Sequence, residues 1–349
     1  MKLYLILSMI FTFVNANTNT INRIQVIMGT YVSVNVQEHH EKAFERMYFV
    51  DSKLSSYNKE ADIYKLNLLR KYKVHPFVLK NLNYSREIYN LTNGYFNIAI
   101  GNITRDLYRF GEDEKIASNI ELRESTVGWK YVKQNSTEIT LMKKVKLDFG
   151  GIGKGIAVDE ASSELFRLGV KDGVISASGD IRCLGKCSIA IKNPFVDGVF
   201  AKFQTKKANI AISTSGNYRR YVKDKKHNHL INPKTKQSQQ NFASVTLVSH
   251  ENNAYVDALS TAISVMPLQR AFLFLKAHKE LGYLLIGTDK RVYFGNLDSF
   301  VTHDIANNQK DRDYKKKFKN QKTKPFDYSK KRQINYEEIT AKHINYKTY

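Results

Sequence analysis

One short stretch of the chain reads Leu147-Asp148-Phe149-Gly150-Gly151-Ile152-Gly153-Lys154-Gly155-Ile156-Ala157-Val158-Asp159. The residues before Gly150 alternate as at the end of a strand, and residues 157–168 have the apolar spacing of a helix. Four glycines and one lysine therefore stand at a strand-to-helix junction. Glycines let backbone N–H groups approach oxygen closely, a helix N-terminus favours negative charge, and Lys154 adds a positive charge. The stretch is thus a candidate phosphate-binding turn.

Two common phosphate-binding motifs do not fit this turn. A P-loop needs a glycine five residues before Gly153, where Asp148 stands, and a Ser or Thr after Lys154, where Gly155 stands. The glycine spacing also differs from the G-x-G-x-x-G of dinucleotide folds. A glycine cluster that only lets a helix pack closely remains the alternative at this point.

The N-terminus predicts an exported protein. An apolar run over residues 5–14 leads to Val14-Asn15-Ala16, which has the small-residue pattern that a signal peptidase cuts. The run is too short to span a bilayer, and no cysteine stands at the cut to receive lipid. We therefore expect a signal peptide over residues 1–16 and a soluble periplasmic protein, with an uncleaved N-terminal anchor as the alternative.

Positive charge is the main feature of the composition. The 349 residues include 55 Lys or Arg against 33 Asp or Glu, a net charge of +22, and 42% are apolar, as in a globular chain. Such a surplus favours anionic partners such as phosphates, phospholipid headgroups or acidic proteins. Export and the lack of a recognisable RNA- or DNA-reading motif argue against nucleic acid.

Part of this charge lies near the C-terminus. Residues 310–332 contain eleven Lys or Arg against three Asp, a net charge of +8, with few aliphatic residues. This composition predicts a disordered or loosely attached tail over residues 308–349, after one domain over residues 17–307. The tail is either a solvated segment or an electrostatic tether to anionic membrane lipid or an acidic partner.

The rest of the pattern mixes many strands with a few separated helices. The predicted helices are residues 38–54, 77–92, 157–168 and 254–278, the last with a break at Pro267. The predicted strands are a hairpin over residues 23–36 and segments 138–149, 173–182, 188–192, 199–206, 209–213, 244–249, 283–287 and 291–294. Without a regular β-α-β alternation, this order predicts an α+β fold with largely antiparallel sheets flanked by helices.

Cys183 and Cys187, the two cysteines of the chain, stand four residues apart around an expected turn. In an oxidising compartment this spacing favours a small disulfide across a hairpin, with two free thiols as the alternative. No further soft ligands stand nearby, so we expect no metal site at these residues.

Several other segments combine turns with aromatic or polar side chains. They are Leu54-Ser55-Ser56-Tyr57-Asn58, Asn93-Gly94-Tyr95-Phe96-Asn97, Leu107-Tyr108-Arg109-Phe110-Gly111, residues 212–221, His229-Leu230-Ile231-Asn232-Pro233-Lys234-Thr235 and Asp257-Ala258-Leu259-Ser260-Thr261-Ala262. Together with Met28-Gly29-Thr30 and Lys154, they follow the order seen in the ApbE-type proteins, the FAD:protein FMN transferases. The chain resembles this family over roughly residues 24–300.

The resemblance implies a set of site residues. Those implied to bind FAD are Met28, Tyr57, Tyr95, Phe96, Asn97, Asp148 and Lys154. Those implied to bind one or two Mg²⁺ ions are the Gly151 carbonyl and the side chains of Asp257 and Thr261. The implied catalytic residues are His229, Lys154 and Asp257.

The implied metal ligands are chemically reasonable. Mg²⁺ prefers hard oxygen ligands and binds substrate phosphates while it keeps several waters. Asp257 and Thr261 are four residues apart, so they share one face of the expected helix. The alternative is a purely local role for this pair. Asp257 would then be a carboxylate at the N-terminus of the helix, and Thr261 would bond to the backbone of its own helix.

The implied reaction moves the FMN part of FAD to a Thr or Ser hydroxyl on an acceptor flavoprotein of an electron-transfer chain, and it releases AMP. A metal and a cation can neutralise the diphosphate charge with little covalent help from the enzyme. His229 would transfer a proton or position the acceptor, because imidazole titrates near neutral pH, and a histidine that caps the next turn is the alternative. A flavin carrier without activity and a pyrophosphatase that splits FAD are the alternative functions.

Five residues depart from the family pattern. Ala61 replaces Ser, Asn97 replaces Asp, Ser178 replaces the first Gly of Gly-Gly-Asp, Asn232 replaces the Asp of Asp-Pro, and Lys236 replaces Gly. We expect Asn97 and Asn232 each to remove a negative charge near the diphosphate, which would weaken metal binding or change the pH dependence. The implied metal ligands and catalytic residues persist, so we expect an active enzyme.

Overall fold

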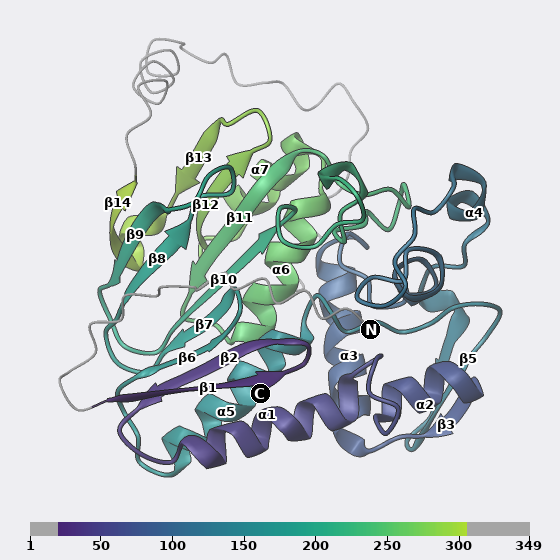
Figure 1. The fold of residues 1–349 in the computed structure, drawn as a ribbon, viewed down its shortest axis with the longest axis horizontal. Coiled ribbons are helices and arrows are strands. Elements are labelled where there is room, and N and C mark those ends of the chain that lie inside the picture. The colour runs from purple at the N-terminus through teal and green to yellow at the C-terminus, as the bar shows by residue number, and fades with distance from the viewer. Residues whose placement is uncertain (1–19, 306–349) are drawn as a thin grey trace.

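An eight-stranded antiparallel sheet runs through the computed structural model, which describes residues 20–305 (Figure 1). Its strands lie in the order β1 (Ile21–Ile27), β2 (Thr30–Val36), β6 (Val174–Ala177), β7 (Asp180–Cys183), β10 (Ile210–Gly216), β11 (Phe242–Ser249), β12 (Gly282–Gly287) and β13 (Val292–Gly295). Two smaller antiparallel sheets are β14 (Val301–Ile305), β9 (Val199–Thr205) and β8 (Ser188–Lys192), and β3 (Lys71–Lys73), β5 (Glu138–Leu141) and β4 (Val132–Gln134). The α+β class with antiparallel sheets is confirmed.

Seven α-helices lie within the described residues. They are α1 (His40–Leu54), α2 (Asp62–Leu69), α3 (Pro76–Leu91), α4 (Asn119–Glu124), α5 (Gly153–Arg167), α6 (Asn253–Val265) and α7 (Leu268–Ala277). A π-helical segment over Asn102–Leu107 and three short 3₁₀ turns add to these. Within residues 20–305, no helix has the length and apolar character needed to span a bilayer.

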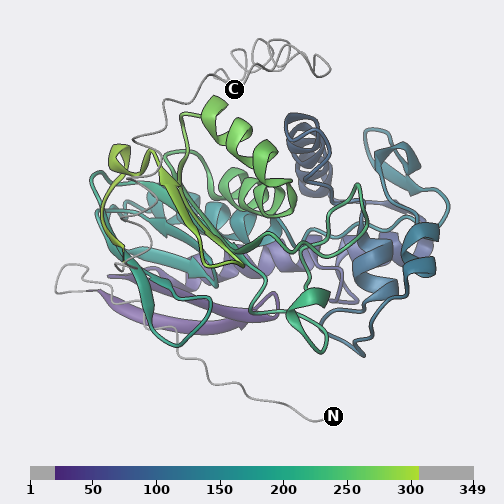
Figure 2. The same ribbon diagram turned by 90° about the horizontal axis from the view of Figure 1, so that it is seen from above.

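The large sheet separates two hydrophobic cores. Helices α5 and α6 lie side by side against one face, as Figures 1 and 2 show. Because side chains alternate along a strand, Val245 and Leu247 of β11 join the core under these helices. Val248 points the other way, into a second core with Ile189 and Phe203 of the β14-β9-β8 sheet. The helix-covered face therefore carries the helix that begins at the glycine turn.

Several sequence-predicted elements are confirmed, and three are corrected. The hairpin near Met28 and the helix break at Pro267 are present. The predicted strand over residues 138–149 ends at Leu141, because both backbone groups of Leu147 bond to the side chain of Asn67 instead of a neighbouring strand. The predicted strand 173–182 is a hairpin of two strands, and the helix predicted from residue 157 begins at Gly153.

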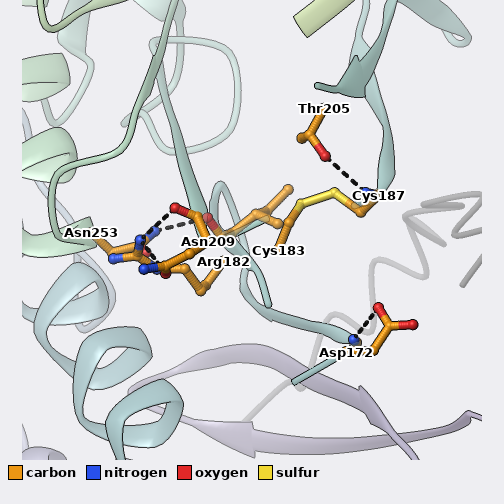
Figure 3. The surroundings of a disulfide bond; sticks show 9 residues. Asp172, Arg182, Cys183, Cys187, Thr205, Asn209 and Asn253 are labelled. Atoms are coloured by element: carbon orange, nitrogen blue, oxygen red, sulfur yellow. Dashed lines mark hydrogen bonds between the residues drawn. A yellow bond between two sulfur atoms is a disulfide. The ribbon is translucent and has the colours of Figure 1, made fainter. Parts of the chain in front are cut away.

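Cys183 and Cys187 form a disulfide, as Figure 3 shows. The predicted hairpin around it is wrong, because Cys183 ends β7 of the large sheet while β8 belongs to the β14-β9-β8 sheet. The disulfide therefore joins the two sheets at one turn. The Cys187 N–H donates to Thr205 Oγ1 at 2.9 Å and completes this link to β9.

The predicted signal peptide over residues 1–16 and the predicted tail over residues 308–349 lie outside the described residues. Both remain predictions, as does the domain boundary between them.

Candidate active site

The glycine turn is a crossing point of three elements. A Cβ on Gly155 would lie 2.5 Å from the carbonyl oxygen of Asn253, so α5 and α6 can cross this closely only with glycine here. A Cβ on Gly153 would lie 3.1 Å from Cε of Met28, which follows β1. A Cβ on Gly151 would lie 3.1 Å from Thr261. Close helix packing is thus real at Gly155, while the other glycines bring predicted site residues together.

Lys154 sits between two buried carboxylates. Its Nζ lies 3.0 Å from Asp180 Oδ2 and 3.3 Å from Asp257 Oδ2. Both aspartates are 2% exposed. Asp257 Oδ2 also accepts the N–H of Gly155 at 3.0 Å, which ties the α6 carboxylate to the first turn of α5. The sequence prediction therefore placed Lys154 and Asp257 together correctly, but it missed Asp180.

The charges of this cluster do not balance. One ammonium faces two carboxylates, so the ionised cluster carries one negative charge in excess. Burial, and then the neighbouring Asp180, raise the pKa of Asp257 to about 7. Burial works against the charge of Lys154, but the two carboxylates outweigh it and raise the pKa of its ammonium. Lys154 is therefore charged at neutral pH, and the site favours an additional cation near Asp257.

A chain of hydroxyl groups extends from the cluster between β10 and α6. Ser213 Oγ donates to Asp180 Oδ1 at 2.5 Å and lies 3.2 Å from Ser260 Oγ. Ser260 Oγ lies 2.7 Å from Ser215 Oγ, which in turn lies 3.4 Å from Thr261 Oγ1. Because one hydroxyl can donate and accept, this chain fixes Asp180 and Thr261 relative to each other.

The three predicted metal ligands form a set of hard oxygens. Thr261 Oγ1 lies 3.5 Å from the carbonyl oxygen of Gly151, and Asp257 lies one turn earlier on α6. Among residues 20–305, no three His, Cys, Asp or Glu side chains form a metal-binding group, so a metal here depends on these hydroxyl and carbonyl oxygens. The donor set and the excess negative charge fit Mg²⁺.

His229 is neutral at physiological pH. Burial, together with the positive charges of Arg220 and Lys154, lowers its pKa to about 4, although part of its surface is accessible. Its Nδ1 lies 3.0 Å from the carbonyl oxygen of Arg220. A carbonyl can only accept, so Nδ1 carries the hydrogen and Nε2 keeps its lone pair. The ring is therefore neutral with a free acceptor nitrogen at Nε2, and the charges of Lys154 and Asp148 act on it.

Asp148 fixes the other end of the glycine turn. Its Oδ2 accepts from Thr104 Oγ1 at 2.5 Å, and its Oδ1 accepts the N–H of Gly150 at 2.9 Å. Phe96, only 2% exposed, lies with Cε2 3.5 Å from a Cβ placed on Gly151. The structure thus brings these predicted FAD-binding residues to the turn.

Tyr57 is held by two arginine side chains. It is 39% exposed, and the guanidinium carbons of Arg105 and Arg220 lie 3.5 Å and 5.6 Å from its ring centroid. Its hydroxyl donates to the carbonyl oxygen of Phe110 at 2.8 Å and accepts from Arg220. The two arginines hold an accessible aromatic ring beside the chain that carries His229. Arg220 belongs to the segment 212–221 noted in the sequence, while Arg105 had no such signal.

Tyr95 and Asn97 are held in other ways. Tyr95 lies under the ammonium of Lys234, which is 4.8 Å from the ring centroid. Asn97 Oδ1 accepts the N–H of Ala99 at 2.9 Å, so this side chain closes the turn that follows α3.

Three departures from the family pattern have local explanations. Asn232 Nδ2 donates to the carbonyl oxygen of Val265 at 2.8 Å, a bond that an aspartate cannot donate. Ser178 and Lys236 keep the left-handed backbone that glycine adopts most easily, with φ of 60° and 62°. Asn232 is therefore an anchor at the end of α6, and the sequence expectation that it faces the diphosphate gains no support from these contacts.

The fold and the site define the class: an antiparallel α+β protein whose glycine turn, carboxylate-paired lysine and neutral histidine suit a phosphorylated ligand. The ApbE family model matches residues 28–285, and the chain belongs to the ApbE family.

Similar proteins include two FAD:protein FMN transferases. The one from Rhodobacter capsulatus is 30% identical over 209 residues, which cover 56% of this chain and 39% of the relative. The one from Haemophilus influenzae is 24% identical over 282 residues, which cover 74% of this chain and 81% of the relative. The chain thus spans well under half the length of the first relative and most of the second.

Solved structures show the same fold. An ApbE protein of Thermotoga maritima superposes with a TM-score of 0.73 at 24% identity and covers 80% of this chain and 98% of its own. The flavin transferase ApbE of Vibrio cholerae superposes with a TM-score of 0.70 at 20% identity. The match covers 82% of this chain and 99% of the Vibrio cholerae chain.

Proposed function

We propose that this chain is an exported, periplasmic FAD:protein FMN transferase that depends on Mg²⁺ and acts on an acceptor flavoprotein of an electron-transfer chain. The names of its relatives support the flavin transfer, and the predicted signal peptide supports export. The observation that carries the proposal is the cluster of Lys154 with its two buried aspartates beside the glycine turn. In this proposal the cluster would hold a fixed positive charge and a cation-attracting carboxylate, Asp257, close to the diphosphate.

The reaction exchanges one bond at phosphorus for another. The acceptor hydroxyl oxygen forms a bond to the phosphorus on the FMN side of FAD, and the bond from that phosphorus to the bridging oxygen breaks. The bridging oxygen and the bond's electron pair leave with AMP, while the hydroxyl proton passes to Nε2 of His229. Lys154 binds the diphosphate as a fixed charge and does not transfer a proton, because its pKa is raised.

The metal would be held by the Gly151 carbonyl, Asp257 and Thr261. When bound, it supplies charge neutralisation on the diphosphate. Tyr57 and Phe96 would contact the flat rings of FAD, and Met28 would line the pocket at the glycine turn. Asp148 would hold that turn in the shape that binds the substrate.

One assay separates this proposal from a carrier and from a pyrophosphatase. The protein is incubated with FAD and Mg²⁺, with and without a peptide that carries an acceptor Thr, and AMP and in-gel flavin fluorescence are followed. We expect AMP only with the peptide, together with a fluorescent peptide. AMP without the peptide would indicate a pyrophosphatase, and bound flavin without AMP would indicate a carrier.

A further inference from the structure

The segment between β10 and β11 is strongly basic. Residues 217–241, here called the β10–β11 excursion, contain seven Lys or Arg against a single Asp, a net charge of +6. The excursion carries His229. The proposed transfer assigns no role to most of its positively charged side chains. Arg220 is already engaged with Tyr57.

Three lysines at the tip of the excursion are available to a partner. Lys223, Lys225 and Lys226 are exposed, and within residues 20–305 none of them forms an ion pair with a carboxylate. Asp224, the one acidic residue among them, accepts the backbone N–H of Lys226 at 2.8 Å. The tip therefore presents a cationic cluster to solvent.

Among residues 20–305, no carboxylate forms an ion pair with this cluster, and those of a neighbouring acidic turn bond to other groups. The turn that follows Phe110 reaches Arg220, because a Cβ on Gly111 would lie 2.8 Å from its Nη2. The carboxylates of this turn are used elsewhere. Glu112 pairs with Arg105, Asp113 pairs with Arg109, and Glu114 accepts the N–H of Gly111.

Backbone hydrogen bonds connect the tip to His229. The His229 N–H donates to the Arg220 carbonyl at 3.2 Å, and the Val222 N–H donates to the His227 carbonyl at 3.0 Å. These bonds form a short antiparallel ladder that runs from the histidine to the lysines. At about 3.4 Å per residue along such a ladder, the lysines lie about 10–13 Å from His229.

We propose that this lysine cluster, Lys223, Lys225 and Lys226, is the docking surface for an acidic segment of the acceptor protein. The inference rests on the proposed function, because it concerns the partner whose hydroxyl approaches His229. An extended acceptor with its hydroxyl at His229 would place residues three or four positions away at the tip, where carboxylates would meet the lysines. A lipid surface is the less suitable partner, because the cluster is confined to the end of one hairpin that leads into the site.

The test uses the full chain and two acceptor peptides that share one Thr. One peptide carries Asp residues three and four positions from the Thr, and the other carries Asn there. The variant K223Q/K225Q/K226Q is compared with the wild type and with a matched control, K171Q/K202Q/K207Q. The control removes the same charge from exposed lysines of other segments.

We expect the KM of the wild type for the Asp peptide to be about tenfold lower than that of the tip variant, with kcat and the KM for FAD unchanged. Raised salt should weaken Asp-peptide binding to the wild type more than binding to the tip variant. The Asn peptide and the matched control variant should show no such difference. Melting temperatures confirm that both variants fold.

Three outcomes would overturn the inference. An equal rise in the KM for FAD would assign the lysines to the substrate phosphates. Unchanged kinetics with all peptides would remove the surface from acceptor binding. Unchanged peptide kinetics with lost binding to phosphatidylglycerol vesicles would make it a membrane contact.

A direct binding measurement keeps this proposal separate from the proposed function. Fluorescence anisotropy of the Asp peptide needs no FAD and no catalysis. Binding that the tip variant loses, in a wild type that transfers no FMN, would support the surface and refute the transferase. Transfer without this difference in binding would refute the surface alone.

Discussion

Lys154 and His229 belong to two parts of the molecule that are held in different ways. Lys154 lies in the first turn of α5, and its two carboxylate partners, both buried, come from β7 of the large sheet and from α6. His229 stands on the β10–β11 excursion and is oriented by a backbone carbonyl. The first part is fixed by packed secondary structure, and the second by local hydrogen bonds.

This difference bears on two of the five departures from the family pattern, those that lie in the excursion. The residues of the Lys154 cluster match the family pattern, because buried charges leave few acceptable substitutes. The excursion carries two departures, Asn232 and Lys236, and each makes its own bond to a backbone carbonyl. A segment held by local hydrogen bonds tolerates a substitution when the new side chain forms a hydrogen bond of its own. We therefore expect changes in the cluster to affect activity most, and changes in the excursion's anchors to affect stability by small amounts.

The largest effect is expected for Asp257→Asn. The amide can still accept from the Gly155 N–H, but it removes the negative charge that favours a metal. Loss of several kcal/mol of charge stabilisation in the transition state should lower FMN transfer by about a thousandfold. The rate is measured as AMP release with an acceptor peptide.

The matched control is Asp197→Asn, which changes a fully exposed carboxylate between β8 and β9. It should leave the rate unchanged. An Asp257→Asn enzyme that keeps more than a tenth of the wild-type rate would remove this residue from the metal site.

The next effect tests the excursion's contribution to chemistry. Replacing His229 with Gln removes the proton acceptor, and general-base catalysis typically contributes about 10²–10⁴-fold. We expect a loss of about a hundredfold or more in FMN transfer, with FAD affinity, read by flavin fluorescence, unchanged. The control is His227→Gln in the same excursion. Equal rates for the two variants would mean that His229 only supports the turn.

Much of the fold was visible in the sequence because its signals are local. The alternation around Met28, the break at Pro267 and the four-residue spacing of Asp257 and Thr261 all act within one element. The disulfide was also predictable from the spacing of its cysteines. Its link between two sheets was not, because strand partners are set by contacts far along the chain.

The site was less predictable for the same reason. Asp180 pairs with Lys154 from a different strand hairpin, and no periodicity reports such a pair. Its position after Ser178 and Gly179, in a tight turn, was the available signal. Arg105 reaches Tyr57 from the π-helical segment and Arg220 from the β10–β11 excursion, so neither contact could be assigned from spacing.

A smaller effect concerns pH and stability. The pKa of His229 is about 4 in the folded state and about 6.5 when unfolded, so between these values the unfolded chain binds more protons. The contribution of the neutral His229 ring to the free energy of unfolding is therefore complete above pH 6.5, and it falls as the pH is lowered towards 4. Because the ring is partly accessible, we expect a loss of about 1–2 kcal/mol in unfolding free energy over this window.

The measurement is urea unfolding of the wild type and of His229→Gln at several pH values. The stability difference between the two proteins should change over this window in the stated direction. Asp257, whose raised pKa acts in the opposite sense, is common to both and cancels. A pH-independent difference would contradict the burial of a neutral ring.

The smallest expected effect on stability is at Lys236, where the side-chain hydrogen bonds and the positive φ can be tested separately. Its Nζ donates to the carbonyl oxygens of Arg123 and Ser125 at 2.7 Å and 2.8 Å, at the end of α4, while its backbone has a positive φ. Lys236→Ala loses the bonds and keeps the strain, so it should lower the unfolding free energy by about 1 kcal/mol. Lys236→Gly loses the bonds but relieves the strain, and the two terms should nearly cancel.

Equal urea midpoints for the Ala variant and the wild type would show that the bonds contribute nothing. Equal midpoints for Ala and Gly would show that the backbone is unstrained, and the excursion would then need another explanation for its tolerance of a lysine at this position.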